Sequence, residues 1–144
     1  MKHLDLMQTY LADINVFKVK LLNMHWNVVG KQFMILHNLT EEFYDILWEQ
    51  IDVVAEVIRM KDELPLSTIK EYLETTRIEE VPAREFTSKE VLDYFIADLE
   101  TMKELTVEIR NTADEAGDFE TVALFEDYAA EYSKYIWFTK SLNK

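Results

Sequence analysis

The sequence predicts an all-α protein in which four long helices form one bundle. Only two glycines and two prolines occur in 144 residues, too few turn residues for a fold built from many strands. Hydrophobic residues make up 49% of the chain, which is enough for the core of one domain spanning residues 1–144. Apolar residues also recur every three or four positions over long segments, the period of an amphipathic helix.

The N-terminal half is predicted to contain two helices joined by a single glycine. The first covers about residues 4–29 and carries a stripe of apolar side chains. Gly30 is the only break before a second helix over about residues 32–61. Pro65 ends that region, because a proline inside a helix removes a hydrogen bond and clashes with the preceding turn. The short turn predicts an antiparallel hairpin.

The segment between Pro65 and Pro82 is predicted to be a long connection that contains a short helix. Ser67 or Thr68 is placed to cap this helix, which continues through Leu73. A connection of this length can return the chain to the end of the bundle from which the second helix started.

The C-terminal half is predicted to form a second helical hairpin. The sequence "TSKE" at Thr87–Glu90 has the form of a capping box, and the helix that follows runs to about Ala116. Gly117 is placed to end it, and Asp118 to cap a last helix that reaches the C-terminus. Two hairpins joined by one long connection are the arrangement of ferritin-like four-helix bundles with a single crossover.

Composition limits the classes of function. The chain has no cysteine, which removes disulfides, thiolate nucleophiles and cysteine-ligated metals. Its 15 basic and 28 acidic residues give a formal net charge of −13, which repels nucleic acids and anionic membranes. The first residues lack the apolar region of a signal peptide, and no apolar run is long enough to cross a bilayer. We therefore expect a soluble, cytoplasmic protein.

The candidate site contains two of the three histidines and three carboxylates at helical spacing. His37 and Glu41 are four residues apart and share a helix face, and the same is true of Asp52 and Glu56. His25 lies just across the glycine turn from His37. Ferritin-like di-iron proteins often carry Glu-x-x-His motifs in the bundle core, and this chain has none.

The spacing along the second helix indicates a site shared by two subunits. His37 and Asp52 are fifteen positions apart, so they differ by about 60° around the helix and by about 22 Å along it. One metal ion cannot contact both within one chain. If the helix packs antiparallel against its copy across a two-fold axis, the His37 end meets the Asp52 and Glu56 end twice per dimer. This mixed nitrogen and oxygen set suits Fe(II), with Zn or Mn as substitutes.

The same segment resembles the signature of the Dps family, the mini-ferritins named as DNA-binding proteins from starved cells. The family pattern is His-Trp, a glycine turn, Leu-His and then Asp-x-x-Ala-Glu. Its counterparts here are His25-Trp26, Gly30, Leu36-His37 and Asp52 to Glu56. The segments "LPLSTIKEYLE" and "YIWF" resemble the family's central connection and C-terminal helix, so the likeness extends over nearly the whole chain.

The resemblance implies a hollow dodecamer that oxidises Fe(II), preferably with hydrogen peroxide, and stores ferric mineral. It implies that His25, His37 and Glu41 come from one subunit, and Asp52 and Glu56 from its partner. In this interpretation the two histidines, Asp52 and Glu56 are the catalytic residues, and all five bind iron.

Two positions depart from the family pattern. Glu41 stands where the family often has Asp, and Val57 stands where it usually has Arg after the Ala-Glu pair. The second change affects a local ion pair and the tuning of the Glu56 end, and leaves the ligand set in place.

Several residues have two interpretations. The acidic residues around the predicted last turn are either helix caps and solvated charges or, by family resemblance, an acidic pore that draws iron in; they are Asp114, Glu115, Asp118, Glu120 and Asp127. Trp26 and Trp48 are interface packing, or in the case of Trp26 an oxidisable neighbour of the site. Glu42 and Glu49 are exposed charges or cavity-facing groups that nucleate mineral, and His3 is expected to be solvated.

Two other functions compete with iron storage. The first is compaction of DNA, the activity that gave the Dps family its name. The second is a metal-free helical adaptor, which leaves the histidine and carboxylate set unexplained.

We predict that the protein does not retard DNA in a gel at physiological salt. Binding to DNA gains free energy when clustered lysines and arginines release counterions from phosphates. Here only Met1–His3 precede the predicted first helix, and the C-terminus adds only Lys140 and Lys144. An electrophoretic mobility assay measures this, and a clear shift without added divalent metal would contradict it.

Overall fold

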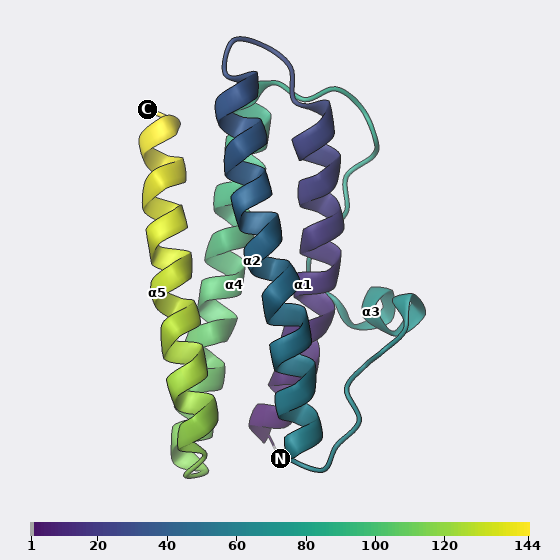
Figure 1. Cartoon of the computed structure of the whole chain (residues 1–144), viewed down its shortest axis with the longest axis vertical. Coiled ribbons are helices and arrows are strands. Elements are labelled where there is room, and N and C mark those ends of the chain that lie inside the picture. Colours follow the sequence, from purple (N-terminus) through teal and green to yellow (C-terminus); the bar gives the residue numbers. More distant parts are fainter. Residues whose placement is uncertain (1) are drawn as a thin grey trace.

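The computed structural model describes residues 2–144 and contains four long helices that run side by side (Figure 1). The helices are α1 (Lys2–Asn27), α2 (Phe33–Met60), α4 (Ser88–Glu115) and α5 (Phe119–Leu142), with the short α3 (Ile69–Thr75) between α2 and α4. Within the described residues, no strand is present. The predicted all-α, ferritin-like bundle with one long crossover is confirmed.

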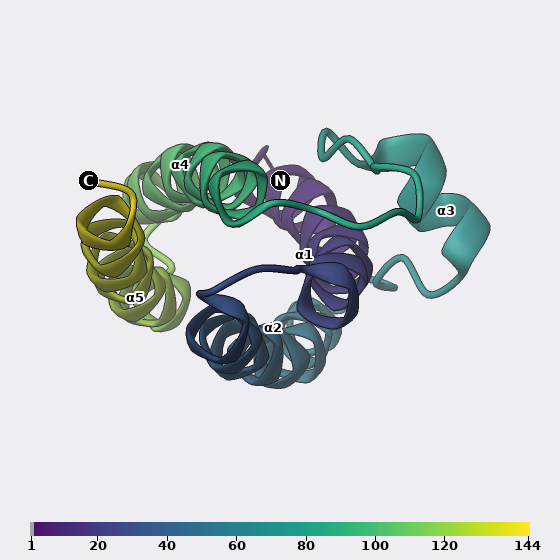
Figure 2. The same cartoon turned by 90° about the horizontal axis from the view of Figure 1, so that it is seen from above.

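Seen from above, the long helices form a ring in the order α4, α1, α2 and α5 (Figure 2). Helix α3 lies outside this ring, beside α1. One end of the bundle carries the α1–α2 turn and the start of α4, and the other carries the N-terminus and the α4–α5 turn (Figure 1). In residues 2–144, no helix is both long and apolar enough to span a membrane.

Helix α1 ends two residues earlier than the predicted position 29 because the chain pairs with another segment there. The backbone N–H of Val29 donates to the carbonyl of Phe86 at 2.9 Å, and the N–H of Phe86 donates to the carbonyl of Asn27 at 3.0 Å. These bonds hold the end of the crossover against the α1–α2 turn. Gly30 has a φ of +113°, a conformation that residues with a Cβ rarely adopt.

Asp13 fixes the crossover to α1. Its carboxylate is fully buried and accepts hydrogen bonds from the hydroxyl of Thr76 (2.8 Å), the backbone N–H of Arg77 (2.7 Å) and the Arg77 guanidinium (2.6 and 3.0 Å). A buried carboxylate is tolerated when it is paired and hydrogen-bonded in this way. Of the two candidate caps for α3, Thr68 is the one used, since its hydroxyl accepts from the N–H of Glu71.

The predicted capping residues of the second hairpin are confirmed. Thr87 and Glu90 form a reciprocal capping box at the start of α4, and Asp118 accepts a hydrogen bond from the N–H of Thr121 at the start of α5. Gly117 has a φ of +73° in the turn between the two helices. The helix-cap interpretation of Asp118 is therefore correct.

The expectation that His3 is solvated is wrong. His3 is 1% exposed, and its Nε2 lies 3.1 Å from Oδ2 of Asp118. The ammonium of Lys61 lies 3.0 Å from Oδ1 of the same carboxylate. Asp118 thereby joins the start of α1, the end of α2 and the start of α5. No local pattern in the sequence signals this contact, because the bundle brings together residues 115 positions apart.

We predict that Asp118 stabilises the fold in a pH-dependent way. Burial raises the pKa of Asp118, but hydrogen bonds from Thr121, Lys61 and His3 outweigh burial and lower this pKa from 3.8 to about 2. A carboxyl with a lowered folded pKa contributes stability above its unfolded pKa, and the contribution is lost as the pH falls through the folded pKa.

Asp118→Asn keeps a good helix cap but removes the charge. We expect it to lower the free energy of unfolding by about 2 kcal/mol at neutral pH, with the difference shrinking between pH values of about 4 and 2. Denaturant unfolding at one protein concentration and a series of pH values measures this. A difference that stays constant down to the lowest pH would contradict the assignment.

Candidate metal centre

The α1–α2 turn brings His25 and His37 into direct contact. Their rings stack with centroids 3.8 Å apart and an interplanar angle of 14°. Phe33, in the first turn of α2, stacks against His37 at 5.1 Å. His25 is buried, whereas His37 is partly exposed. Two imidazoles are thus held at one end of the bundle, at the edge between α1 and α2.

Hydrogen bonds of the pair determine which ring nitrogens are free. Nδ1 of His25 lies 2.7 Å from the backbone carbonyl oxygen of His37, and Nδ1 of His37 lies 2.8 Å from that of His25. A carbonyl oxygen only accepts, so each Nδ1 carries the hydrogen. In the neutral rings the lone pair is therefore on Nε2. An imidazole whose other nitrogen donates to a carbonyl is oriented for metal binding through that lone pair.

Thr40 adds a second contact to His25. Its hydroxyl donates to the carbonyl of Leu36 at 2.8 Å, and its oxygen lies 3.1 Å from Nδ1 of His25. Because the hydroxyl hydrogen is directed at Leu36, the oxygen serves as a second acceptor for His25. Thr40 is fully buried, which fixes this geometry. Thr40 is not among the residues predicted from the sequence, although its position one turn after His37 is a signal that indicates it.

The three carboxylates do not join the histidines within one chain. Glu41, Asp52 and Glu56 are exposed on α2, and Asp52 is about 22 Å from His37 along the helix. In residues 2–144, no group of three or more His, Asp or Glu side chains is placed to hold a metal ion. The structure therefore brings together His25 and His37, with Glu41 one turn further along α2, and leaves Asp52 and Glu56 on another part of the surface.

The largely apolar core of the bundle contains a small cluster of polar groups. The hydroxyls of Tyr10 and Tyr132 are 2.7 Å apart, and Tyr10 donates to Oε1 of Gln50. Both tyrosines are fully buried, and burial raises the pKa of each phenol far above neutrality, so both stay protonated. Neutral hydroxyls and an amide do not form the carboxylate-rich site that a metal in the bundle core would need.

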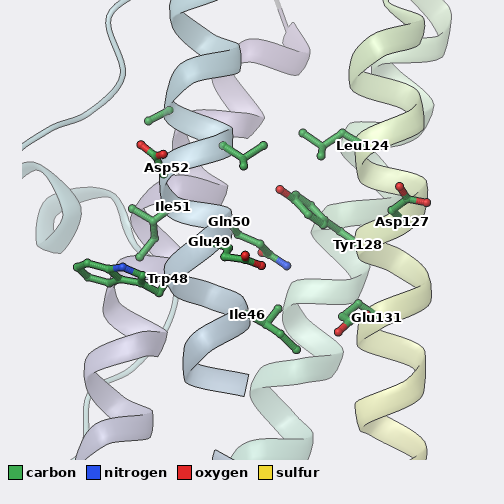
Figure 3. A pocket seen from close by; sticks show the side chains of 12 residues that line it. Ile46, Trp48, Glu49, Gln50, Ile51, Asp52, Leu124, Asp127, Tyr128 and Glu131 are labelled. Carbon is green, nitrogen blue, oxygen red and sulfur yellow. The ribbon is translucent and has the colours of Figure 1, made fainter. Parts of the chain in front are cut away.

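A groove of about 890 Å³ is lined by residues of α2 and α5. Figure 3 shows Glu49 and Gln50 directed toward α5, across the groove from Tyr128. Trp48 and Asp52 extend from the opposite side of α2 in the same view. Asp52 and Trp48 therefore share the side of α2 that is turned away from α5, although both also border the groove. We call this the outer face of α2.

Large apolar side chains are exposed on the helices around this face. Trp26 is 64% exposed next to His25, and Trp48 is 58% exposed on the outer face of α2. Ile69 of α3 is 77% exposed. Exposed apolar side chains of this size are typical of surfaces that associate with another protein.

Comparison with known proteins agrees with this architecture. The family model of the ferritin-like domain matches residues 4–144. A DNA protection during starvation protein of Helicobacter pylori is 34% identical over 137 residues, which cover 95% of each chain. The fold and the paired histidines thus define a ferritin-like helical-bundle protein.

Solved structures narrow the class. The structure of Helicobacter cinaedi CAIP has a TM-score of 0.95 and 34% identity, covering 99% of each chain. A Dps protein from Vibrio cholerae has a TM-score of 0.94 and 29% identity, covering 99% of this chain and 89% of its own. The chain belongs to the Dps family of ferritin-like proteins.

We predict that Thr40 contributes to metal binding at the histidine pair. Thr40→Val keeps the shape of the side chain but removes the second acceptor for His25, so we expect the affinity for Zn²⁺ to fall by roughly tenfold. Thr40→Ser retains the hydroxyl and should bind as the unmodified protein does. Isothermal titration calorimetry on the assembled, metal-free protein compares the three. Equal affinity of the valine and serine variants would contradict this role.

Proposed function

We propose that this protein oxidises Fe(II) with hydrogen peroxide at sites shared between subunits, and stores the ferric product in a hollow shell of twelve subunits. One observation carries the proposal. The reciprocal Nδ1–H bonds of His25 and His37 leave two Nε2 lone pairs at one place, while Asp52 and Glu56 lie too far along α2 to join them within the chain. A second copy of the chain completes the set.

In the proposed site, His25, His37 and Glu41 of one subunit face the partner subunit's Asp52 and Glu56. Neutral imidazole nitrogen and carboxylate oxygen together suit Fe(II) and accept Zn or Mn. The Vibrio cholerae structure is described as a member of a broad superfamily of ferritin-like diiron-carboxylate proteins, which supports iron as the metal. Isologous pairing gives two such sites per dimer.

The proposed reaction needs no reactants other than Fe(II), hydrogen peroxide and water. Two Fe(II) ions each lose one electron, and one hydrogen peroxide accepts both as its O–O bond breaks. With two water molecules, the products are two FeO(OH) units and four protons. The histidines hold and orient the metal, and the carboxylates place negative charge beside it. That charge favours Fe(III) over Fe(II), because the attraction grows with the charge of the ion.

The charge of the chain supports iron storage over direct binding to DNA. The net charge of −13 attracts cations and repels phosphates. The Helicobacter pylori relative is named for DNA protection. Removal of Fe(II) and peroxide protects DNA without contact, because the two together generate hydroxyl radicals.

The acidic residues near the α4–α5 turn have a smaller part in this proposal. Asp118 is already paired with Lys61 and His3, so its charge is largely balanced. Asp114, Glu115 and Glu120 remain exposed and can attract iron at this end of the bundle.

A mixture of two inactive variants tests whether the site is shared. His37→Ala and Asp52→Ala should each lose peroxide-driven Fe(II) oxidation, although the residues lie on opposite halves of α2. In a mixed dimer, one interface site lacks both ligands and the other is intact. Co-assembly should therefore recover part of the activity that neither variant has alone.

Native mass spectrometry first confirms that mixed dimers form. A site within one chain could not recover, since every subunit would carry a damaged copy. Mixed dimers whose oxidation rate stays at the level of either variant would show that the assignment is wrong.

A further inference from the structure

We propose that Lys18 of each subunit forms an ion pair with the partner subunit's Asp45, and that these two pairs set the register in which the shared sites form. The inference rests on the proposed intersubunit site. It adds a specific pair of residues outside that site, and it identifies the partner of the outer face of α2 as a second copy of this chain.

The first observation is the position of Lys18. Its ammonium lies 4.2 Å from the centroid of the Trp48 ring. The Lys18 side chain therefore extends from α1 and places its positive charge at the outer face of α2. Burial lowers the pKa of Lys18. Within residues 2–144, no carboxylate lies within ion-pair distance of Lys18, although eleven other pairs of this kind are present. A partly buried lysine without a carboxylate is suited to receive one from outside the chain.

The second observation is that Asp45 lies on the same stripe of α2 as the proposed ligands. It is seven residues before Asp52 and eleven before Glu56, so it lies within about 20° of each around the helix. Lys18 is likewise seven residues before His25 on α1 and within about 20° of it. A dimer that brings the partner's carboxylate stripe to the His25 stripe therefore also brings Asp45 toward the stripe of Lys18.

The heights of the residues along the bundle axis also bring Lys18 close to the partner's Asp45. The stacking of the two rings places His25 and His37 at the same height along the bundle axis. Lys18 is seven residues before His25, and α1 and α2 run in opposite directions, so Lys18 lies at the height of position 44 in α2 of the same chain. The shared site aligns His37 with position 54 of the partner, midway between its two carboxylates. Position 44 is then level with the partner's position 47. Asp45 is two residues from there, about 3 Å along the axis, within reach of a lysine side chain.

The same register explains why such a pair is needed. If position 37 meets position 54 of the partner, the two-fold axis passes near positions 45 and 46. Asp45 and its copy then approach each other at the axis, and like charges brought together at an interface oppose association. Asp45 is exposed and has no ion-pair partner within residues 2–144. A lysine from each subunit balances both charges and favours this register over neighbouring ones.

Charge reversal tests the pairing. Lys18→Glu places a negative charge against the partner subunit's Asp45, and Asp45→Lys places a positive charge against the partner subunit's Lys18, so each variant alone repels its own copy twice. Each should dissociate with a constant raised by at least about tenfold. In a mixed dimer of the two variants both pairs are attractive. One pair joins the two substituted positions, whose charges are exchanged, and the other joins the unchanged Lys18 of one subunit to the unchanged Asp45 of the other. Mixing should therefore restore association that neither variant shows alone.

Sedimentation velocity over a range of concentrations measures association, and circular dichroism confirms that each variant remains helical. Lys103→Glu and Glu104→Lys make the same changes of charge on α4, in the other half of the bundle, and should associate as the unmodified protein does.

Two results would overturn the inference. One is normal association of both reversal variants. The other is helical variants that stay dissociated when they are mixed. Either result would leave the shared iron site standing, because recovery of oxidation by mixed His37→Ala and Asp52→Ala subunits tests that site independently.

Discussion

The rigidity of α2 is the constraint on which the proposed site depends. A continuous helix from Phe33 to Met60 fixes His37 and Asp52 about 22 Å apart on nearly the same side. No rotation of side chains can close that distance. The chain can hold a metal with both residues only by placing a second α2 beside the first, so assembly becomes a condition for the chemistry.

The rest of the fold prepares one half of that site in advance. The backbone bonds between Val29 and Phe86 fix the α1–α2 turn, and the reciprocal bonds between His25 and His37 fix both rings. Asp13 holds the crossover to α1 in a similar way. Because the imidazoles are already oriented, binding of a metal has little side-chain entropy left to overcome. The proposed carboxylate half, Asp52 and Glu56, is in contrast exposed on the surface of the single chain.

Most of the fold could be predicted from the sequence because its signals are local. Helical periodicity and the capping residues Thr87 and Asp118 mark the helices, and the scarcity of glycine and proline excludes most alternatives. The burial of His3 and the contact of Lys18 with Trp48 could not be predicted, because they depend on which helices become neighbours. The pairing of the two histidines could be predicted in part, because a turn with a single glycine brings together the helix ends that carry them. The carboxylate ligands remain a prediction, because their partners belong to another chain.

The position of iron in crystals of the assembled protein tests the central claim most directly. Crystals soaked with Fe(II) without oxidant, and measured at the iron absorption edge, show each bound ion by its anomalous scattering. We predict an ion in contact with Nε2 of His25 or His37 in one subunit and with the partner subunit's Asp52 or Glu56. Iron bound only by carboxylates of the groove between α2 and α5, or only by groups from a single chain, would contradict it.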